Sequence, residues 1–157
     1  MLFQGSLRGE LAKSEHIVDV AGDGQTVRAT ALWHDVDDWD SPTPPMRQLL
    51  PRLWQLFGTR TLRAMRISPA MTSVHPEEPH RYLHFIGVHK EAQGSGLGGA
   101  LLTSMTQECD ELGLPAYLES SNPVNNALYH RFGFVDRGLV PLPKGAPPML
   151  AMWRDPR

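Results

Sequence analysis

Four glycines lie within six residues of this chain, from Gly94 to Gly99 (GSGLGG), between two segments of different character. The preceding run, Tyr82 to Val88, is almost entirely apolar, as in a strand that is covered on both faces. The residues that follow, up to Leu112, carry apolar side chains about one helical turn apart. The sequence therefore predicts a buried strand, a glycine-rich turn and an amphipathic helix in direct succession.

A glycine-rich turn between a strand and a helix is suited to binding a phosphate group. Glycine permits the left-handed backbone angles that turn successive N–H groups to one side, and it has no Cβ to hold a ligand away. The positive end of the helix dipole also attracts an anion. The chain has 15 Lys plus Arg against 17 Asp plus Glu, a formal charge of -2. An anionic ligand must then be held locally, and no nucleic-acid partner is expected.

One interpretation of the glycines is a dinucleotide-binding fold. Gly94, Gly96 and Gly99 satisfy G-x-G-x-x-G, and Glu119 ends the next predicted strand at about the ~20-residue offset of that fingerprint. However, His89 to Gln93 separate the first glycine from its strand, whereas the fingerprint starts directly at the strand end. A β-hairpin predicted near the N-terminus also differs from the repeated βαβ units of such a fold.

The N-terminal half predicts a helix, a hairpin and a loop-rich segment. Leu2 to Lys13 has apolar residues about one turn apart, which favours a short amphipathic helix. His16 to Val20 and Gln25 to Trp33 are β-rich and flank AGDG, which favours an antiparallel pair. The acidic, proline-rich Asp35 to Pro45 predicts a loop, and Met46 to Met71 predicts short helices broken by proline and glycine.

The C-terminal half alternates between strands and helices. Pro115 to Glu119 predicts a short strand, and Asn122, directly before a proline, predicts the start of a helix. Phe134 to Leu139 and Met149 to Trp153 predict two strands joined by a proline-rich loop. The chain as a whole is therefore expected to be one α/β domain with Tyr82 to Val88 as its central strand.

Composition excludes several other classes of protein. A single cysteine, Cys109, excludes an intramolecular disulfide framework and a Cys-rich zinc module. No apolar run approaches the roughly 18 residues of a membrane span, and the N-terminus lacks the pattern of a signal peptide. We therefore expect a cytoplasmic protein with no membrane partner.

Two motifs, in this order, resemble the GNAT superfamily of N-acetyltransferases. Gln93, Gly96 and Gly98 give Q-x-x-G-x-G, similar to the loop that follows the fourth strand there and binds the pyrophosphate of acetyl-CoA. Glu119 to Phe134 (ESSNPVNNALYHRFGF) is similar to the next segment of that superfamily. The segments HPEEPHRYLHFIGV and PPMLAMWRD resemble a bacterial small-molecule branch. The likeness covers roughly Val18 to Asp155.

The resemblance implies a GNAT-like fold, with a mixed, mostly antiparallel sheet that is splayed at its central strands and flanked by helices. Acetyl-CoA would be the co-substrate, with its pantetheine arm paired to the main chain of the central strand and its pyrophosphate in the glycine loop. A bulge at Gly87 would open the slot for the arm, although this glycine could equally mark close packing against a helix. The residues expected to bind the coenzyme are Ile86, Gly87, Val88, Gln93, Gly94, Ser95, Gly96, Leu97, Gly98, Gly99, Asn122, Asn125 and Tyr129.

Acetyl transfer requires a neutral amine and a proton for the departing thiolate. Tyr129 is the candidate general acid, because a phenol with a pKa of about 10 stays protonated at neutral pH; the alternative is a half-buried tyrosine with a bonded hydroxyl. Glu119 and His84 are both candidates for the general base, a chain of water molecules would also serve, and the sequence does not choose among them. Cys109, on the apolar stripe of its helix, is interpreted as a core residue, which implies direct transfer in a ternary complex.

Several expectations concern the acceptor side of the site. The acceptor is expected to be a small-molecule amine. A metal site is not expected: His80 and His84 share one face of a strand with His75 nearby, but this spacing matches no zinc signature. Apolar side chains that could line an acceptor pocket are Met46, Met65, Met71, Trp33, Trp39 and Trp54.

The resemblance also bears on how much of the fold the chain contains. It implies a single acetyltransferase domain over residues 1–157, truncated at the N-terminus because the usual first strand and first helix before the hairpin are missing from the pattern. A homodimer would be one way to complete the fold. The main alternative function is a non-catalytic module that binds the coenzyme or a nucleotide, and a dinucleotide-dependent oxidoreductase comes third.

Overall fold

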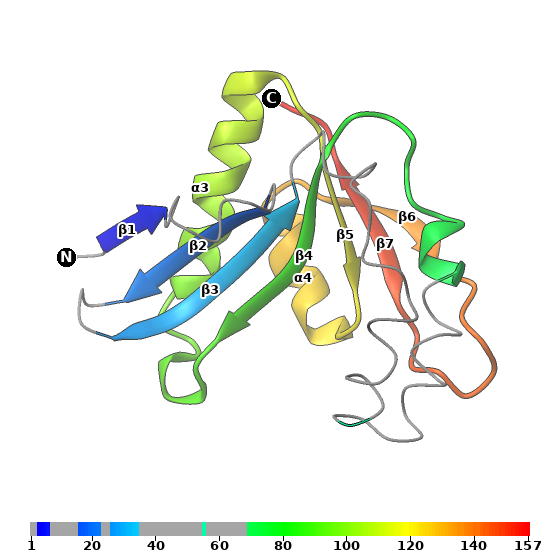
Figure 1. Cartoon of the computed structure of the whole chain (residues 1–157), viewed down its shortest axis with the longest axis horizontal. Coiled ribbons are helices and arrows are strands. Elements are labelled where there is room, and N and C mark those ends of the chain that lie inside the picture. Colours follow the sequence, from blue (N-terminus) through cyan, green and yellow to red (C-terminus); the bar gives the residue numbers. More distant parts are fainter. Residues whose placement is uncertain (1–2, 7–15, 23–25, 35–54, 56–68) are drawn as a thin grey trace.

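The protein folds around a seven-stranded sheet whose fourth strand in spatial order is β4 (Arg81–Val88) (Figure 1). The structure, a computed structural model, describes residues 3–6, 16–22, 26–34, 55 and 69–157, with side chains from residue 19 onward. In the order β1-β2-β3-β4-β5-β7-β6, all neighbours pair antiparallel except β4 and β5, which pair parallel. The other strands are β1 (Phe3–Ser6), β2 (His16–Gly22), β3 (Val27–His34), β5 (Ala116–Ser120), β6 (Val135–Leu139) and β7 (Leu150–Arg154).

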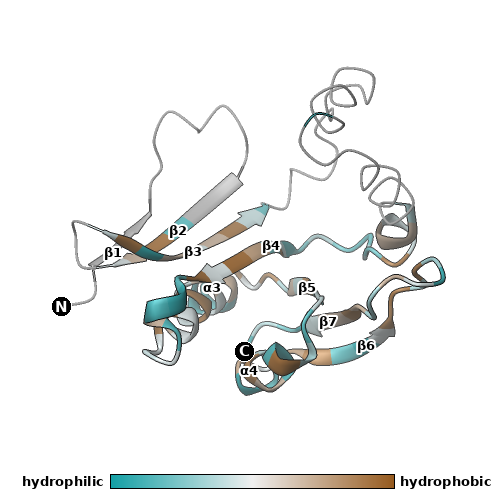
Figure 2. Ribbon diagram, turned by 90° about the horizontal axis from the view of Figure 1, so that it is seen from below, coloured by the Kyte–Doolittle hydropathy of each residue, from teal (hydrophilic) through white to brown (hydrophobic). Residues whose placement is uncertain are grey.

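Two helices cover one face of this sheet, α3 (Leu97–Leu112) and α4 (Asn126–Arg131). Figures 1 and 2 both show them on the same side, and α3 packs against β2, β3 and β4. A 3₁₀ turn, η2 (Lys90–Ala92), lies between β4 and the glycine loop, and another, η3 (Pro123–Asn125), precedes α4. The core between helices and sheet includes the buried side chains Trp33, Leu83, Leu101, Leu102, Met105, Leu118 and Met152.

Residues 69–80 lie on the opposite face of the sheet, and their first four residues are helical. Met71 and Val74 pack there against a second apolar cluster that contains Tyr82 of β4, Tyr117 of β5 and Trp153 of β7. The strands β4, β5 and β7 therefore contribute side chains to apolar clusters on both faces of the sheet.

The sheet opens between β4 and β5. Only three residue pairs join the two strands, and the last is Leu83 with Leu118. Beyond this point β4 runs away from β5, and Figure 1 shows the two ribbons diverging in front of α4. Leu32 of β3 pairs with Phe85 and Trp33 pairs with Leu83, so that His84 is the extra residue of a β-bulge on β4. The bulge lies where the strand begins to turn away.

Several predicted elements are confirmed. The β2–β3 hairpin is antiparallel, β4 is central, and α3 lies between Gly96 with φ 85° and Gly113 with φ 67°. The turn residues 23–25, the loop at 35–45 and most of the segment 46–71 lie outside the described residues. Because the sheet is mainly antiparallel and has one parallel pair among the described strands, the dinucleotide-binding interpretation is wrong.

Other predictions need correction. Within the helix expected over Leu2 to Lys13, Phe3–Ser6 is instead a strand paired with β2, and a strand does precede the hairpin. An open sheet edge supplies hydrogen bonds that outweigh the weak helical preference of four residues with a glycine among them. The expected bulge at Gly87 is also wrong, since Gly87 pairs regularly with Thr30. A Cβ built on Gly87 would meet no atom within 4 Å, so close packing does not explain it either.

Side chains in the second half of β4 and at the end of α3 are more exposed to solvent than the sequence predicts. The second half of β4 is not covered on both faces, and Phe85 is 63% exposed where the strand faces the open wedge. Leu112, expected on the buried stripe of α3, is 55% exposed because the helix ends there beyond the edge of the core. Cys109 is fully buried, as expected for a core residue, and burial raises the pKa of its thiol to about 11.

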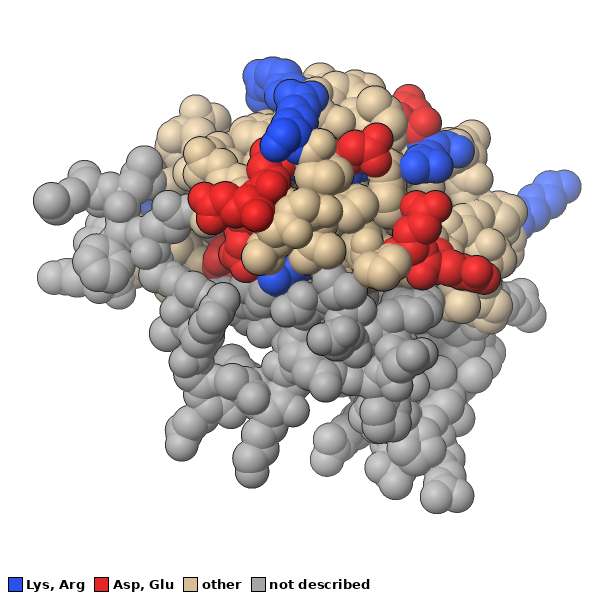
Figure 3. All heavy atoms as spheres, turned by 90° about the horizontal axis from the view of Figure 1, so that it is seen from above, with Lys and Arg blue, Asp and Glu red and all other residues tan. Residues whose placement is uncertain are grey.

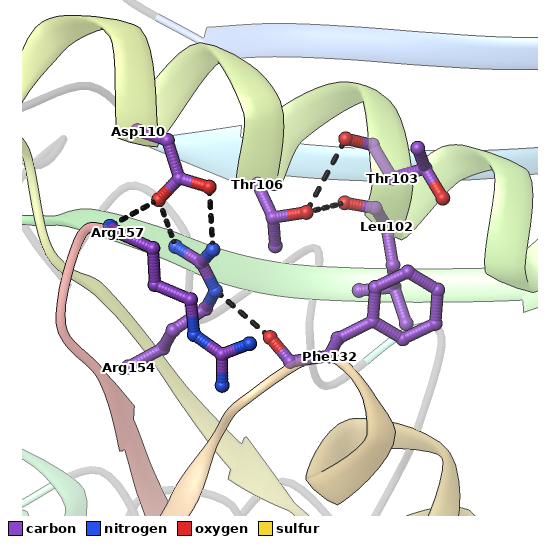
Figure 4. A network of polar contacts seen from close by, with 7 residues as sticks. All are labelled: Leu102, Thr103, Thr106, Asp110, Phe132, Arg154 and Arg157. Carbon is purple, nitrogen blue, oxygen red and sulfur yellow. Dashed lines mark hydrogen bonds and ion pairs between the residues drawn. The ribbon is translucent and has the colours of Figure 1, made fainter.

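A polar network ties the end of α3 to β7 (Figure 4). The guanidinium of Arg154 donates two hydrogen bonds to the carboxylate of Asp110, at 2.8 and 2.7 Å. Its Nε donates to the carbonyl oxygen of Phe132 at 2.8 Å, and the main-chain N–H of Arg157 donates to Asp110. The pKa of Asp110 is lowered mainly by its hydrogen bonds from Arg154. One buried arginine therefore joins a helix, a strand and the turn after α4.

The described surface gives no sign of a membrane segment or of one dominant charge. No helix among the described residues has the length and apolar character needed to cross a bilayer. On the face seen in Figure 3, basic and acidic side chains are interspersed.

Candidate functional site

The glycine loop presents main-chain N–H groups at the start of α3. Gly94 and Gly96 have φ angles of 79° and 85°, which L side chains rarely adopt. A Cβ at either position would meet no atom within 4 Å, so the space in front of the loop is open. The N–H groups of Leu97, Gly98 and Gly99 belong to the first helical turn and have no acceptor within the helix.

Two side chains at the start of this loop make hydrogen bonds to main-chain oxygens of the residues that precede it. Ser95 Oγ donates to the carbonyl oxygen of Ala92 at 2.5 Å, and Gln93 Nε2 lies 3.4 Å from the carbonyl oxygen of Val88. Both bonds are made to the segment that joins β4 to the loop, so they fix its position relative to the strand. Gln93 and Ser95, two of the predicted coenzyme residues, therefore have a local structural role in this structure.

A cavity of about 120 Å³ lies in the wedge between β4 and β5. Its walls come from β4, β5 and the start of the α4 segment. The lining residues are Leu83, His84, Phe85, Ile86, Leu118, Glu119, Ser120, Ser121, Asn122, Asn125 and Tyr129. The wedge thus brings together Tyr129, Glu119 and His84, the three residues predicted to be catalytic.

Glu119 is a buried carboxylate at the end of β5. Its side chain is 2% exposed, and the hydroxyl of Tyr82 donates to its Oε2 at 2.6 Å. Its Oε1 makes no hydrogen bond of ordinary geometry among the described residues and lies 3.9 Å from His75 Nδ1. The buried hydroxyl of Tyr117 is also near this carboxylate, and burial, followed by the charge of Glu119, raises its pKa. Burial, and secondly the charge of Glu119, raise the pKa of Tyr82, so Tyr82 remains a hydrogen-bond donor. A buried carboxylate oxygen with unused acceptor capacity is a strong site for a cationic or N–H-bearing ligand.

Tyr129 lies on α4, buried, with its ring edge-on to Phe134. Burial raises the pKa of its hydroxyl, and a hydrogen bond from Asn125 opposes this only in part. The phenol therefore stays protonated at neutral pH and can donate a proton into the cavity.

His84 enters the wedge through the bulge in β4. Its ring lies 4.2 Å from that of Phe85 and 5.0 Å from that of His34, centroid to centroid. His84 is exposed, in contrast to Glu119. The two candidate bases thus occupy one cavity but different environments.

The Asn residues at the start of the α4 segment have partly structural roles. Asn122 Oδ1 accepts from the N–H of Val124 at 3.2 Å, which confirms the predicted helix cap. Ser120 Oγ lies 2.6 Å from Asn126 Oδ1, which ties β5 to α4. Asn122 and Asn125 both line the cavity. The backbone of this segment is thus held rigidly against the wedge.

Sequence reasoning missed the residues behind Glu119. The sequence places Tyr82 only in an apolar strand, because its contact with Glu119 spans 37 positions along the chain. The spacing of His75 and His80 indicates no role beyond metal binding, whereas in the structure their Nε2 atoms lie 3.1 Å apart. Their clustering near His84 in the sequence was the available signal. Among the described residues, no group of three His, Cys, Asp or Glu is arranged to hold a metal ion.

Two of the apolar side chains expected to line an acceptor pocket, Trp33 and Met71, are among the described residues. Trp33 is fully buried in the core between sheet and helices, so the suggestion that it lines a pocket is wrong. Met71 packs against the cluster around Tyr82 on the opposite face. Met46, Met65, Trp39 and Trp54 lie outside the described residues.

The loop and the wedge fit the parts of a coenzyme A thioester. Left-handed glycines, open space where a Cβ would stand and unpaired first-turn N–H groups suit a diphosphate. The open edge of β4 from His84 to Val88 offers main-chain groups to an extended arm that bears amides. The loop follows the C-terminal end of β4, the strand whose residues Leu83 to Ile86 line the cavity.

Comparison with known proteins agrees with this geometry. The acetyltransferase (GNAT) family model matches residues 33–134. An uncharacterized N-acetyltransferase of Schizosaccharomyces pombe is 38% identical over 120 residues, which are 67% of this chain and 46% of that protein. The mycothiol acetyltransferase of Streptomyces coelicolor is 37% identical over 67 residues, which are 41% of this chain and 22% of that enzyme. The chain thus spans less than half the length of either curated relative.

A solved structure extends the likeness to nearly the whole chain. The structure described as histone acetyltransferase HPA2 and related acetyltransferase from Corynebacterium glutamicum is 30% identical, with a TM-score of 0.65. The match covers 94% of this chain and 68% of that one. The splayed mixed sheet is therefore shared with a known acetyltransferase structure.

Proposed function

Because the chain belongs to the acetyltransferase (GNAT) family, we propose that it moves an acetyl group from acetyl-CoA to the primary amine of a small molecule. One observation carries the proposal. The wedge between β4 and β5 holds a cavity lined by a buried carboxylate and a protonated phenol, and the strand β4 that lines it is followed by a glycine loop with N–H groups at the start of α3. An anionic carrier and an acid–base pair are what transfer from a thioester to an amine requires.

In this proposal the chain binds the carrier largely through main-chain atoms. The N–H groups of Gly94 and of Gly96 to Gly99 hold the diphosphate, whereas the Ser95 N–H donates to the carbonyl oxygen of Ala92. Ile86, Gly87 and Val88 pair with the pantetheine arm. Asn122 and Asn125 contact the arm where it enters the cavity. The carrier supplies the thioester carbonyl carbon that the amine attacks.

In the proposed reaction Glu119 is the general base and Tyr129 is the general acid. Glu119 removes a proton from the incoming ammonium, which frees the nitrogen lone pair. The C–N bond then forms as the C–S bond breaks, and Tyr129 Oη gives its proton to the departing sulfur. The phenolate recovers a proton as the amide nitrogen loses its second one. Overall an ammonium and a thioester give an amide, a thiol and one proton, which leaves by way of Glu119.

Glu119 is the better of the two bases because its Oε1 is buried and makes no hydrogen bond of ordinary geometry among the described residues. An ammonium bound there would satisfy that oxygen and be oriented by it. His84 is solvent-exposed and lies edge-on to the rings of His34 and Phe85. We expect Glu119→Gln to lower kcat by at least 100-fold and His84→Gln to lower it less than tenfold. The reverse order would assign the base to His84.

The proposal is tested in two steps. Isothermal titration should give saturable binding of acetyl-CoA and no heat with NAD. Release of CoA thiol is then followed with a panel of primary amines, including diamines, aminoglycosides and amino acids. No acetyl-CoA binding would refute the proposal. Binding without turnover on any amine would favour the non-catalytic module, and turnover only with protein amines would move the acceptor out of the small-molecule class.

The proposal includes one domain over residues 1–157 that acts as a homodimer in the cytoplasm. The outer strand β6 supports self-association, since Val135 and Leu139 are exposed on it. Light scattering coupled to size-exclusion chromatography measures the mass directly, and a monomer at micromolar concentration would refute this part.

A further inference from the structure

Two histidines with buried side chains, His75 and His80, lie next to Glu119. His75 Nδ1 lies 3.9 Å from Glu119 Oε1, and the side chain of His75 is 4% exposed. His75 Nε2 lies 3.1 Å from His80 Nε2. His80 Nδ1 lies 2.6 Å from the main-chain oxygen of Glu78. The four groups form a chain from the cavity to the loop before β4.

The carbonyl of Glu78 fixes which ring nitrogens carry protons. A carbonyl oxygen only accepts, so His80 must donate from Nδ1, and neutral His80 therefore has a bare Nε2. His75 must then donate its own Nε2 proton to His80. In neutral His75 the unprotonated nitrogen is then Nδ1, and Nδ1 is the nitrogen that faces Glu119 Oε1. The carbonyl oxygen of Glu78 thus sets the tautomer of His80, and His80 sets the tautomer of His75. As a result, an unprotonated nitrogen of His75 faces the proposed base, Glu119.

We propose that His75 accepts from Glu119 the proton that Glu119 takes from the amine, and that His80 positions His75 for this by holding its tautomer. The step rests on the proposed function of Glu119. Because Glu119 Oε1 and His75 Nδ1 lie 3.9 Å apart, one water bridges them during the transfer. The O–H bond of the protonated carboxyl breaks as that water accepts the proton, and the water gives one of its own protons to form the N–H bond at His75 Nδ1. Glu119 returns to a carboxylate, and the imidazolium of His75 shares its Nε2 proton with His80 before the proton passes to water.

The surroundings of the pair suit this role. Tyr82 and Tyr117 stand edge-on to His75, at 5.0 Å between ring centroids in both cases. Trp153 of β7 flanks His80 at 5.6 Å. The charged groups that act on His80 are Glu119 and Glu78, together with His75. Burial lowers the pKa of His80, which keeps its ring neutral at neutral pH. The imidazolium would form beside the Glu119 carboxylate, which stabilises it.

The kinetic test replaces His75 by Phe, which keeps a ring against Tyr82 and Tyr117 but has no nitrogen. We expect kcat to fall at least tenfold, with KM for acetyl-CoA changed less than twofold. Added imidazole should restore part of the lost rate. The dependence of kcat on pH should also differ between the wild type and the variant, because only the wild type has the imidazole. His130→Phe is the matched control, because His130 is exposed and paired with Asp136.

His80 is tested by two substitutions with opposite expectations. His80→Gln can still offer an oxygen acceptor to His75 Nε2–H and should retain at least a third of wild-type kcat. His80→Leu offers none and should lose at least tenfold. Equal loss in both variants, or a wild-type pH profile without rescue by imidazole in His75→Phe, would overturn the relay while leaving the proposed function intact. An inactive wild-type protein would instead count against the proposed function.

A second readout does not depend on activity or on variant folding. Histidine side-chain ¹⁵N spectra of the wild-type protein at pH 7.5 report which nitrogen of each ring is protonated. We expect His80 with its proton on Nδ1 and His75 with its proton on Nε2. A proton on Nδ1 of His75 would refute the proposal, because that nitrogen could not then accept from Glu119.

Discussion

Gly96→Asp tests whether the amides at the start of α3 hold a diphosphate. Gly96 has φ 85°, and a Cβ there would project into empty space beside the first-turn N–H groups. An aspartate would tolerate the backbone at a cost of about 1–2 kcal/mol, and its carboxylate would occupy the space where an anion would lie. The fold should survive and the ligand should be repelled.

The expected loss follows from Coulomb's law. Two unit charges about 5 Å apart repel by about 1–3 kcal/mol for an effective dielectric constant between roughly 80 and 20. The two charges of the diphosphate double this to about 2–6 kcal/mol. Acetyl-CoA should therefore bind at least ~30-fold more weakly to Gly96→Asp than to the wild type. The deficit should shrink as salt is added, because the site is open to solvent.

Two control variants separate charge from strain. Gly113→Asp places the same residue at the other end of α3, where φ is 67° and the space is also open. It should lose similar or greater stability in urea denaturation, since a negative charge is unfavourable at a helix C-terminus, but bind acetyl-CoA normally. Gly96→Asn adds the bulk without the charge and should lose less than tenfold in affinity. If titration calorimetry gave Gly96→Asp and Gly113→Asp equal affinities, the loop would not be the diphosphate site.

Three further outcomes are expected. Tyr129→Phe should lower kcat about 10²-fold or more with acetyl-CoA affinity within twofold by calorimetry; a parallel loss of affinity would contradict the division between binding loop and proton donor. Arg154→Met should cost about 2–4 kcal/mol in urea unfolding, since it removes a paired guanidinium and strands the carbonyl of Phe132. Arg154 lowers the pKa of Asp110 in the folded state, so the stabilisation from this ion pair is fully present above the unfolded pKa of about 3.9 and is lost as pH falls through the folded pKa. A difference in unfolding free energy between wild type and variant that stayed constant down to pH 2 would contradict this. Cys109→Ala should keep most of the acetyltransferase activity, and the native thiol, with its pKa raised to about 11, should resist alkylation at pH 8 until the protein unfolds; fast native labelling would show that the thiol is accessible.

Local patterns predicted the parts of the fold that local chemistry determines. The capping glycines of α3, the Asn122 cap and the β2–β3 pairing depend on residues close together in sequence, and the structure confirms them. The glycine loop was predictable for the same reason, since its amides need only glycines and a following helix.

Features that depend on distant partners were not predictable. The bulge forms at His84 rather than Gly87, because the register of β4 against Leu32 and Trp33 determines where an extra residue is accommodated. The contact of Tyr82 with Glu119 requires β4 and β5 to be neighbours. The sequence identified Glu119 as a candidate base but gave no means to rank it above His84. The ranking comes from burial and from an unpaired oxygen, which are properties of the assembled site.

The short junction of β4 and β5 has a consequence for aggregation. An unpaired strand edge is usually a template on which other chains add, and proteins protect such edges with charge, bulges or covering segments. Here the unpaired stretch of β4 lies inside the sheet and is closed at one end by the three pairs with β5. If a strand of another chain paired with β4 in this gap, a second strand could not add beside it, because β5 lies on the other side of the gap. This gap thus keeps main-chain groups available to a small guest without itself offering an edge on which strand after strand could add.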